Sequence, residues 1–137
     1  MNKIFLAIIA VCTFIGCAQE QIKAEENEVS IGDLKKAIVS VIGSPRDLSQ
    51  NQREFTSQYS DLPNTKPKQR VFYKVTVLGS RRPYEVEVKA FVEQRQGSTY
   101  EEVGEDQKLA QRLLKDIQEK LHQGRDGRNL IDDFRAF

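Results

Sequence analysis

The chain has 137 residues, which suffice for one small domain once a leader and a tether are set aside. It contains 21 lysine and arginine residues against 20 aspartate and glutamate residues. This balance gives no net field that would recruit nucleic acid, so we expect no nucleic-acid partner. Charged residues are 30% and apolar residues 39% of the chain, proportions that exclude a largely disordered or integral membrane chain.

Both cysteines, Cys12 and Cys17, lie near the N-terminus, and the 120 residues after Cys17 contain none. No disulfide can therefore cross-link the domain, and a thiol nucleophile is excluded there.

The first residues have the order of a secretory signal: Lys3, an uncharged apolar run over residues 4–15, then Gly16. A run of twelve is shorter than the roughly 20 residues of a spanning helix, so we expect a cleaved signal peptide at residues 1–16.

The sequence Phe14, Ile15, Gly16, Cys17 resembles the lipobox of bacterial lipoprotein precursors, with Phe14 in place of the usual leucine. The resemblance implies cleavage before Cys17 and attachment of acyl chains such as palmitate, which anchor stably when two or three are present. Ala18 implies sorting to the outer membrane, facing the periplasm, in a bacterium that has one. Ordinary cleavage after Ala18, which would release a secreted protein, remains open because Gly16 and Ala18 are both small.

After the leader, the lipidated Cys17 and a polar, glutamate-rich stretch occupy residues 17–29. This stretch has too few apolar side chains to offset the entropy of ordering, so we expect a flexible tether. A domain is expected over residues 30–124. Its first helix begins at Ser30, with Asp33 at the capping-box position, and ends at Gly43 and Pro45. Its apolar stripe comprises Ile31, Leu34, Ile38, Val41 and Ile42.

Alternating apolar and polar residues predict three strands, at residues 53–59, 71–78 and 84–93. In the first, Phe55, Ser57 and Tyr59 share one face. The other two form a hairpin around residues 79–83, in which placing Leu78 opposite Pro83 sets the register. The resulting pairs are Val75 with Val86, Tyr73 with Val88, Val71 with Ala90 and, on the other face, Lys74 with Glu87.

A second helix is expected from Thr99, with Glu102 three residues on, to Gly124. Residues 125–137 then form a tail with one short amphipathic turn, which either docks on the domain or stays mobile and binds a partner. The candidate partner-binding residues in this tail are Leu130, Ile131, Phe134 and Phe137.

The predicted fold is α+β: a two-layer sandwich in the order helix, three-stranded antiparallel sheet, helix. In its element order, its paired alternating strands and its closing helix, the region from Ile31 to Leu121 resembles the BamC-like helix-grip domains of bacterial envelope lipoproteins. The resemblance includes no signature motif, and it carries over no binding residue.

No catalytic set appears in the sequence, and we expect neither an enzyme nor a cofactor. The single histidine, His122, falls at the end of the second predicted helix without a cysteine or carboxylate at ligand spacing, so no metal is expected. Neighbouring carboxylates on a helix diverge by ~100°, which favours solvated faces over a glycosidase pair. These adjacent pairs are Glu101 with Glu102 and Asp132 with Asp133.

Basic residues flank one predicted strand, either to keep it soluble or to contact headgroups, peptidoglycan or an acidic partner. They are Lys66, Lys68, Arg70, Arg81 and Arg82.

The sequence as a whole predicts a noncatalytic envelope lipoprotein, an accessory or scaffold subunit of a membrane-associated complex. The alternative is a periplasmic ligand-binding or inhibitor module, anchored or secreted.

Overall fold

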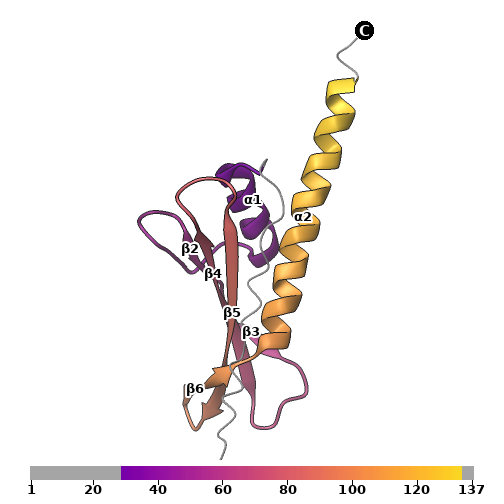
Figure 1. Cartoon of the computed structure of the whole chain (residues 1–137). Coiled ribbons are helices and arrows are strands. Elements are labelled where there is room, and N and C mark those ends of the chain that lie inside the picture. The colour runs from indigo at the N-terminus through magenta and orange to yellow at the C-terminus, as the bar shows by residue number, and fades with distance from the viewer. Residues whose placement is uncertain (1–28, 134–137) are drawn as a thin grey trace, which may run out of the picture.

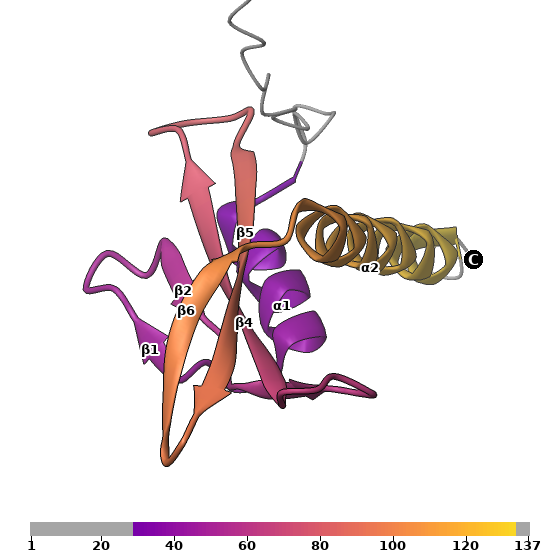
Figure 2. The ribbon, with the colours of Figure 1, turned by 90° about the horizontal axis from the view of Figure 1, so that it is seen from below.

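The computed structural model describes the backbone of residues 29–133 and the side chains of residues 29–124 (Figure 1). Two helices pack on one face of an antiparallel sheet, and Figure 2 shows both on the same side of it. The predicted α+β class is confirmed. The predicted strand number is wrong, since the sheet has six strands rather than three.

The helices and strands follow one another in this order: α1 (Ile31–Ile42), β1 (Asp47–Leu48), β2 (Glu54–Thr56), β3 (Ser60–Leu62), β4 (Gln69–Leu78), β5 (Glu85–Gln96), β6 (Thr99–Glu105) and α2 (Gln107–Asp133). In space the strand order is β1-β2-β4-β5-β6, with β3 also paired to β4. Thus β4 and β5 are the long central strands, β1 and β6 end the main path of the sheet, and β3 pairs with β4 alone.

The first helix has the predicted bounds and caps. The Ser30 hydroxyl accepts a hydrogen bond from the Asp33 amide at 3.0 Å and donates one to its carboxylate at 2.7 Å. At the other end, Gly43 has φ 74°, and its amide donates to the Val39 carbonyl. Because a side chain strongly disfavours that backbone conformation, the helix ends at the glycine.

The strand predicted at residues 53–59 is shorter in the structure, where only β2 (Glu54–Thr56) falls within it, and a break separates β2 from β3. At the break Ser57 turns its hydroxyl to Tyr73, whose amide donates to Ser57 Oγ at 2.8 Å. The Ser57 amide donates to the Tyr73 carbonyl at 2.9 Å, so this buried residue still pairs with β4. Beyond the break the alternation is reset. Phe55 is buried on the helix-facing side, whereas Tyr59 is 39% exposed and contacts the ring of Phe72.

The central hairpin forms, but its predicted register is wrong by two residues. Val75 lies opposite Val88, and Val77 lies opposite Val86, because the connection runs to Tyr84 rather than to Pro83. A shift of two leaves every side chain on its predicted face. It does place Lys74 opposite Lys89 instead of Glu87.

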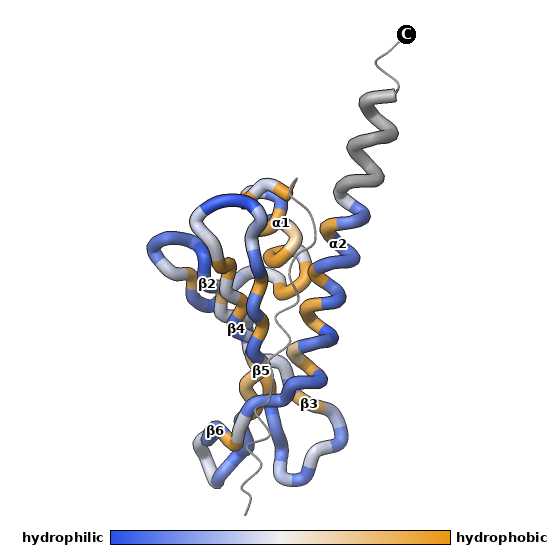
Figure 3. The backbone as a smooth tube through the Cα atoms, viewed as in Figure 1, coloured by the Kyte–Doolittle hydropathy of each residue, from blue (hydrophilic) through white to orange (hydrophobic). Residues whose placement is uncertain are grey.

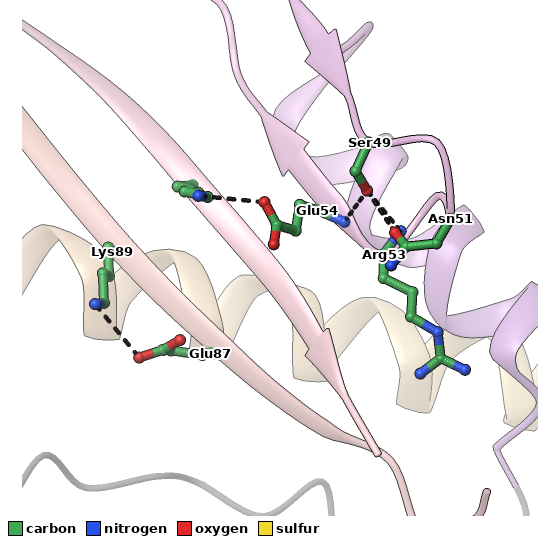
Figure 4. Close-up of polar contacts among 7 residues, drawn as sticks. Ser49, Asn51, Arg53, Glu54, Glu87 and Lys89 are labelled. Carbon is green, nitrogen blue, oxygen red and sulfur yellow. Dashed lines mark hydrogen bonds and ion pairs between the residues drawn. The ribbon is translucent and has the colours of Figure 1, made fainter. Parts of the chain in front are cut away.

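These two lysines form ion pairs with other residues, and Figure 4 shows that of Lys89 with Glu87. Lys74 Nζ lies 3.2 Å from a carboxylate oxygen of Glu54 on β2, and Lys89 Nζ lies 3.7 Å from one of Glu87 on its own strand. In the neighbouring loop, the Ser49 hydroxyl accepts a hydrogen bond from the Glu54 amide at 3.0 Å.

The second helix begins later and ends later than predicted. Residues Thr99–Glu105 are strand β6, and the helix N-cap is Asp106, whose carboxylate accepts hydrogen bonds from the amides of Lys108 and Leu109 at 2.9 and 3.1 Å. The helix does not stop at Gly124 but continues to Asp133, where a linker and a short separate turn were expected. Its last part projects past the end of the sheet (Figure 1).

The core lies between the helices and the inner face of the sheet. Ile38 of α1, Val75 of β4 and Ile117 of α2 are each no more than 1% exposed. Figure 3 shows the matching alternation of apolar and polar residues along β4 and β5. The buried residues of the main core cluster are Leu34, Ala37, Ile38, Phe55, Val75, Val77, Val86, Leu113, Leu114 and Ile117. Each helix therefore packs its apolar stripe on the sheet of the same chain.

Candidate binding surface

The sheet has a second face, which no helix covers, and aromatic rings gather on it. Phe72 of β4 and Phe91 of β5 are directly opposite each other in the register and stack with a centroid distance of 5.1 Å. Tyr59 meets Phe72 edge to face at 5.5 Å. Aromatic pairs in these geometries contribute about 0.5–1.5 kcal/mol beyond their buried area.

Two arginines lie over these rings. The guanidinium carbon of Arg70 is 3.7 Å from the ring centroid of Tyr59 and 3.9 Å from that of Tyr100 on β6. That of Arg46, just before β1, is 4.1 Å from Tyr59 and 5.1 Å from Phe72. We call this set the aromatic–arginine cluster: Arg46, Tyr59, Arg70, Phe72, Phe91 and Tyr100.

The two arginines differ in their charge partners. Arg70 is half-buried and forms a close ion pair with Glu93, with Nη2 at 2.6 Å and Nε at 2.7 Å from the same carboxylate oxygen. Arg46 is exposed, and within residues 29–124 no carboxylate lies at ion-pair distance from its guanidinium. The cluster thus connects β4, β5 and β6 with the residues just before β1 and β3. The guanidinium of Arg46 can still bind an anionic or aromatic group of another molecule.

Few of the residues singled out in the sequence lie on this surface. Cys17, Phe134 and Phe137 are outside the described residues. Leu130 and Ile131 belong to the last turns of α2 by their backbone, far along the helix from the sheet. The predicted partner-binding tail is therefore in large part the end of α2 rather than a separate turn.

The other chemical candidates are dispersed. His122 is exposed, and the helix runs on to Asp133, so it does not stand at the helix end. Glu101 and Glu102 are consecutive residues of a strand, not of a helix, so they point to opposite faces of the sheet. No cluster of three or more potential metal ligands occurs in the described part of the chain. Likewise, none of the described helices is long and apolar enough to span a bilayer.

The predicted basic flanks of β4 are partly neutralised. Lys68 Nζ lies 2.7 Å from an Asp61 carboxylate oxygen, and the hydrogen bond to Asp61 raises the pKa of Lys68. Arg70 pairs with Glu93 as described above. Lys66, Arg81 and Arg82 are exposed in the connections before and after the strand.

Sequence reasoning missed the aromatic–arginine cluster. Phe72 and Phe91 lie on the predicted outward side of their strands, but the predicted register places Phe72 opposite Lys89, so their pairing was not predicted. Tyr59 was assigned to the other face, and Tyr100 to a helix. The signal for Tyr100 was the turn Gly97–Ser98 between two runs with strand-forming residues, which is typical of a two-residue hairpin loop.

The comparisons add no relative. No protein-family model, curated protein or solved structure matches this chain. The similarity to helix-grip envelope lipoproteins therefore stays a prediction from element order, and the aromatic–arginine cluster has to be interpreted from its own chemistry.

Proposed function

We propose that the protein is a noncatalytic lipoprotein of the bacterial envelope, anchored through Cys17 in the outer membrane and facing the periplasm. In this proposal it serves as an accessory or scaffold subunit, and the helix-free face of its sheet contacts a protein partner. The observation that carries the proposed contact surface is the aromatic–arginine cluster. Tyrosine, phenylalanine and arginine are the residue types enriched at protein interfaces, whereas an ordinary solvent-facing sheet surface is polar.

The N-terminal sequence supports the location. A lipobox ending in Gly16 and Cys17, followed by a polar stretch of about a dozen residues, suits a domain held near a membrane without entering it. An extended chain spans at most ~3.3–3.6 Å per residue, so such a tether would allow the domain to reach about 40 Å from the bilayer.

The noncatalytic assignment is supported by the way the described ionisable groups are placed. Perturbed pKa values cluster at functional sites, but here they have local structural causes. The raised pKa of Lys68 comes from its surface ion pair with Asp61, and burial among core residues raises the pKa of Tyr73.

The alternative, a periplasmic ligand-binding or inhibitor module, would need room for a ligand between the helices and the sheet. In that space Ile38, Val75 and Ile117 pack with at most 1% exposure. Native mass spectrometry of the protein purified from cells discriminates the two functions, because a carrier retains a small ligand whereas the proposed subunit does not.

Crosslinking in intact cells, followed by gentle extraction and pull-down, tests the proposed contact. We expect a stoichiometric envelope protein with the natural chain. The double variant Arg46→Glu, Tyr59→Ser should reduce its yield about tenfold, as expected for the loss of about 1.4 kcal/mol at an interface.

The matched control is Lys36→Glu, a charge reversal at an exposed position of α1 on the opposite side of the molecule. It should leave the yield unchanged. Recovery of the anchored protein alone from the natural chain, or equal loss with both variants, would contradict the proposal.

A further inference from the structure

Strand β6 forms an open edge of the sheet. It pairs with β5 on one side, and it is the last strand in the order β1-β2-β4-β5-β6. With seven residues it is longer than the opposite edge strand β1, which has two. Within the described residues β6 pairs with no strand other than β5, so its outer backbone edge is unpaired there. In Figure 2 α2 leads away from the end of β6, and no helix runs along the strand. Such an edge can accept a further strand.

The side chains of this edge are acidic. Glu101, Glu102 and Glu105 are exposed, and no cation of residues 29–124 lies at ion-pair distance from any of them. Glu102 lies opposite Glu93, whose charge is already compensated by Arg70. Three carboxylates thus remain without a local countercharge along one open strand.

A bulge in β6 presents an apolar side chain as well. The register shifts between Val92 and Glu93 of β5, so Val103 has no partner residue there. Val103 is 51% exposed, the highest exposure of any large hydrophobic residue in the described part of the chain. The edge therefore offers backbone groups, negative charge and one apolar contact together.

Charge identifies the kind of strand that fits. Pairing of β6 with β6 of a second copy would bring glutamates against glutamates, which is unfavourable for directly opposed side chains. The acidic stretch with Glu25, Glu26 and Glu28 is disfavoured as an occupant for the same reason. Glutamates and a bulge at an edge thus discourage self-association, as edge charges commonly do, and leave a basic strand as the complementary occupant.

We propose that β6 binds an extended, basic segment of a partner protein as an added edge strand. In this arrangement lysines or arginines at every second position face Glu102 and Glu105, which share the outer sheet face because they lie opposite Glu93 and Phe91. This proposal rests on the proposed function, since it specifies the chemistry of the partner segment next to the aromatic–arginine cluster.

The test uses the membrane-extracted full chain in nonionic detergent and two synthetic nine-residue probe peptides. One alternates lysine with valine and threonine. The other has the same lysines, but every second residue between them is proline. The two peptides therefore have the same charge, while proline prevents the second from pairing as a strand. Fluorescence anisotropy measures binding, and the amide resonances of β6 report its location.

We expect the first peptide to bind and to shift the β6 amides, and the proline peptide to bind at least tenfold more weakly. The double variant Glu102→Lys, Glu105→Lys should weaken binding of the first peptide at least tenfold, with unchanged thermal unfolding. The matched control Glu119→Lys, on the exposed side of α2, should change it less than twofold.

Equal binding of the two peptides would overturn the proposal, since charge alone would then explain it. So would unchanged binding by the double variant, or β6 shifts that depend on protein concentration without peptide, which would indicate a second copy. These results leave the crosslinking outcome untouched, so failure of the edge proposal is distinguishable from failure of the proposed function.

Discussion

The hydroxyl of Ser57 illustrates how a single side chain sets the shape of this sheet. It accepts the Tyr73 amide hydrogen bond at 2.8 Å, a place that a main-chain carbonyl would take in a regular ladder, and donates to the Gln58 carbonyl at 2.8 Å. The chain can therefore break between β2 and β3 without leaving a buried amide unpaired. The break in turn moves Tyr59 to the outer face, where the aromatic–arginine cluster forms.

Replacing Ser57 by alanine should lower the free energy of unfolding by about 1–3 kcal/mol, because the amide of half-buried Tyr73 loses its acceptor at the buried Ser57 position. Urea denaturation measures the change. The control Ser40→Ala removes an exposed hydroxyl that donates to the Ala37 carbonyl, and it should cost no more than about 0.5 kcal/mol. Similar effects of the two substitutions would argue against this role of Ser57.

Tyr73 should make stability depend on pH in the alkaline range. Burial raises its pKa above the ordinary value of 10.0, so the unfolded chain loses this proton at lower pH than the folded protein. Above about pH 10 the unfolded state therefore binds fewer protons than the folded state. The free energy of unfolding should fall as the pH rises from there toward the pKa of the folded state.

Ultraviolet absorbance of ionised tyrosine, recorded on the natural chain and on Tyr73→Phe, checks this expectation. The phenol that disappears in the variant should be one that titrates above the ordinary range. Between about pH 9 and 11, roughly the range around the pKa of a free phenol, the free energy of unfolding should fall less for the variant than for the natural chain. A missing phenol that titrates at the ordinary pKa contradicts the assignment.

Among the elements, α1 and the face pattern of β4 and β5 could be predicted from sequence, because each depends on local chemistry. Ser30 and Gly43 fix the helix ends by capping and by a positive φ, and a period of two fixes which side chains of a strand face the core. The register could not be predicted, since it depends on how many residues the connection uses, and a shift of two preserves every face.

The misassigned start of α2 has a different cause. Thr99 and Glu102 have the spacing of a capping box, but the residues from Thr99 to Glu105 pair with β5 in a hairpin instead, so strand pairing overrides the helix-start signal. The short strands β1 and β3 were missed because two or three residues carry no detectable period. The candidate surface was missed because its residues come from five separate strands or their flanks, two of which were not predicted.

The two glycines at the ends of the predicted helices should respond oppositely to alanine. Gly43 has φ 74°, so Gly43→Ala should destabilise the protein by about 1–3 kcal/mol. Gly124 lies within α2, and an added Cβ would meet no atom within 4 Å. Gly124→Ala should therefore favour the helix by about 0.5–1 kcal/mol.

Circular dichroism at 222 nm during thermal unfolding measures both changes. The helix signal should rise or hold for Gly124→Ala, and the melting temperature should fall for Gly43→Ala. Loss of helix signal in Gly124→Ala would contradict a continuous α2 through this position.

For the whole molecule, we propose that an anchored N-terminus holds a sandwich with helices on one face of its sheet. One face of the sheet packs against α1 and α2, while the other carries the aromatic–arginine cluster, and the sheet ends at the acidic edge strand β6. A domain of this kind acts by contact, and the partners that it can meet depend on where it is held. The proposed function therefore depends first on the proposed lipid at Cys17.

The intact mass of the mature protein extracted from membranes tests this claim most directly, with Cys17→Ser as the control. The account predicts a product that begins at Cys17 and carries acyl chains, absent from the control. A water-soluble natural product that begins at residue 19 and carries no fatty acid would contradict it.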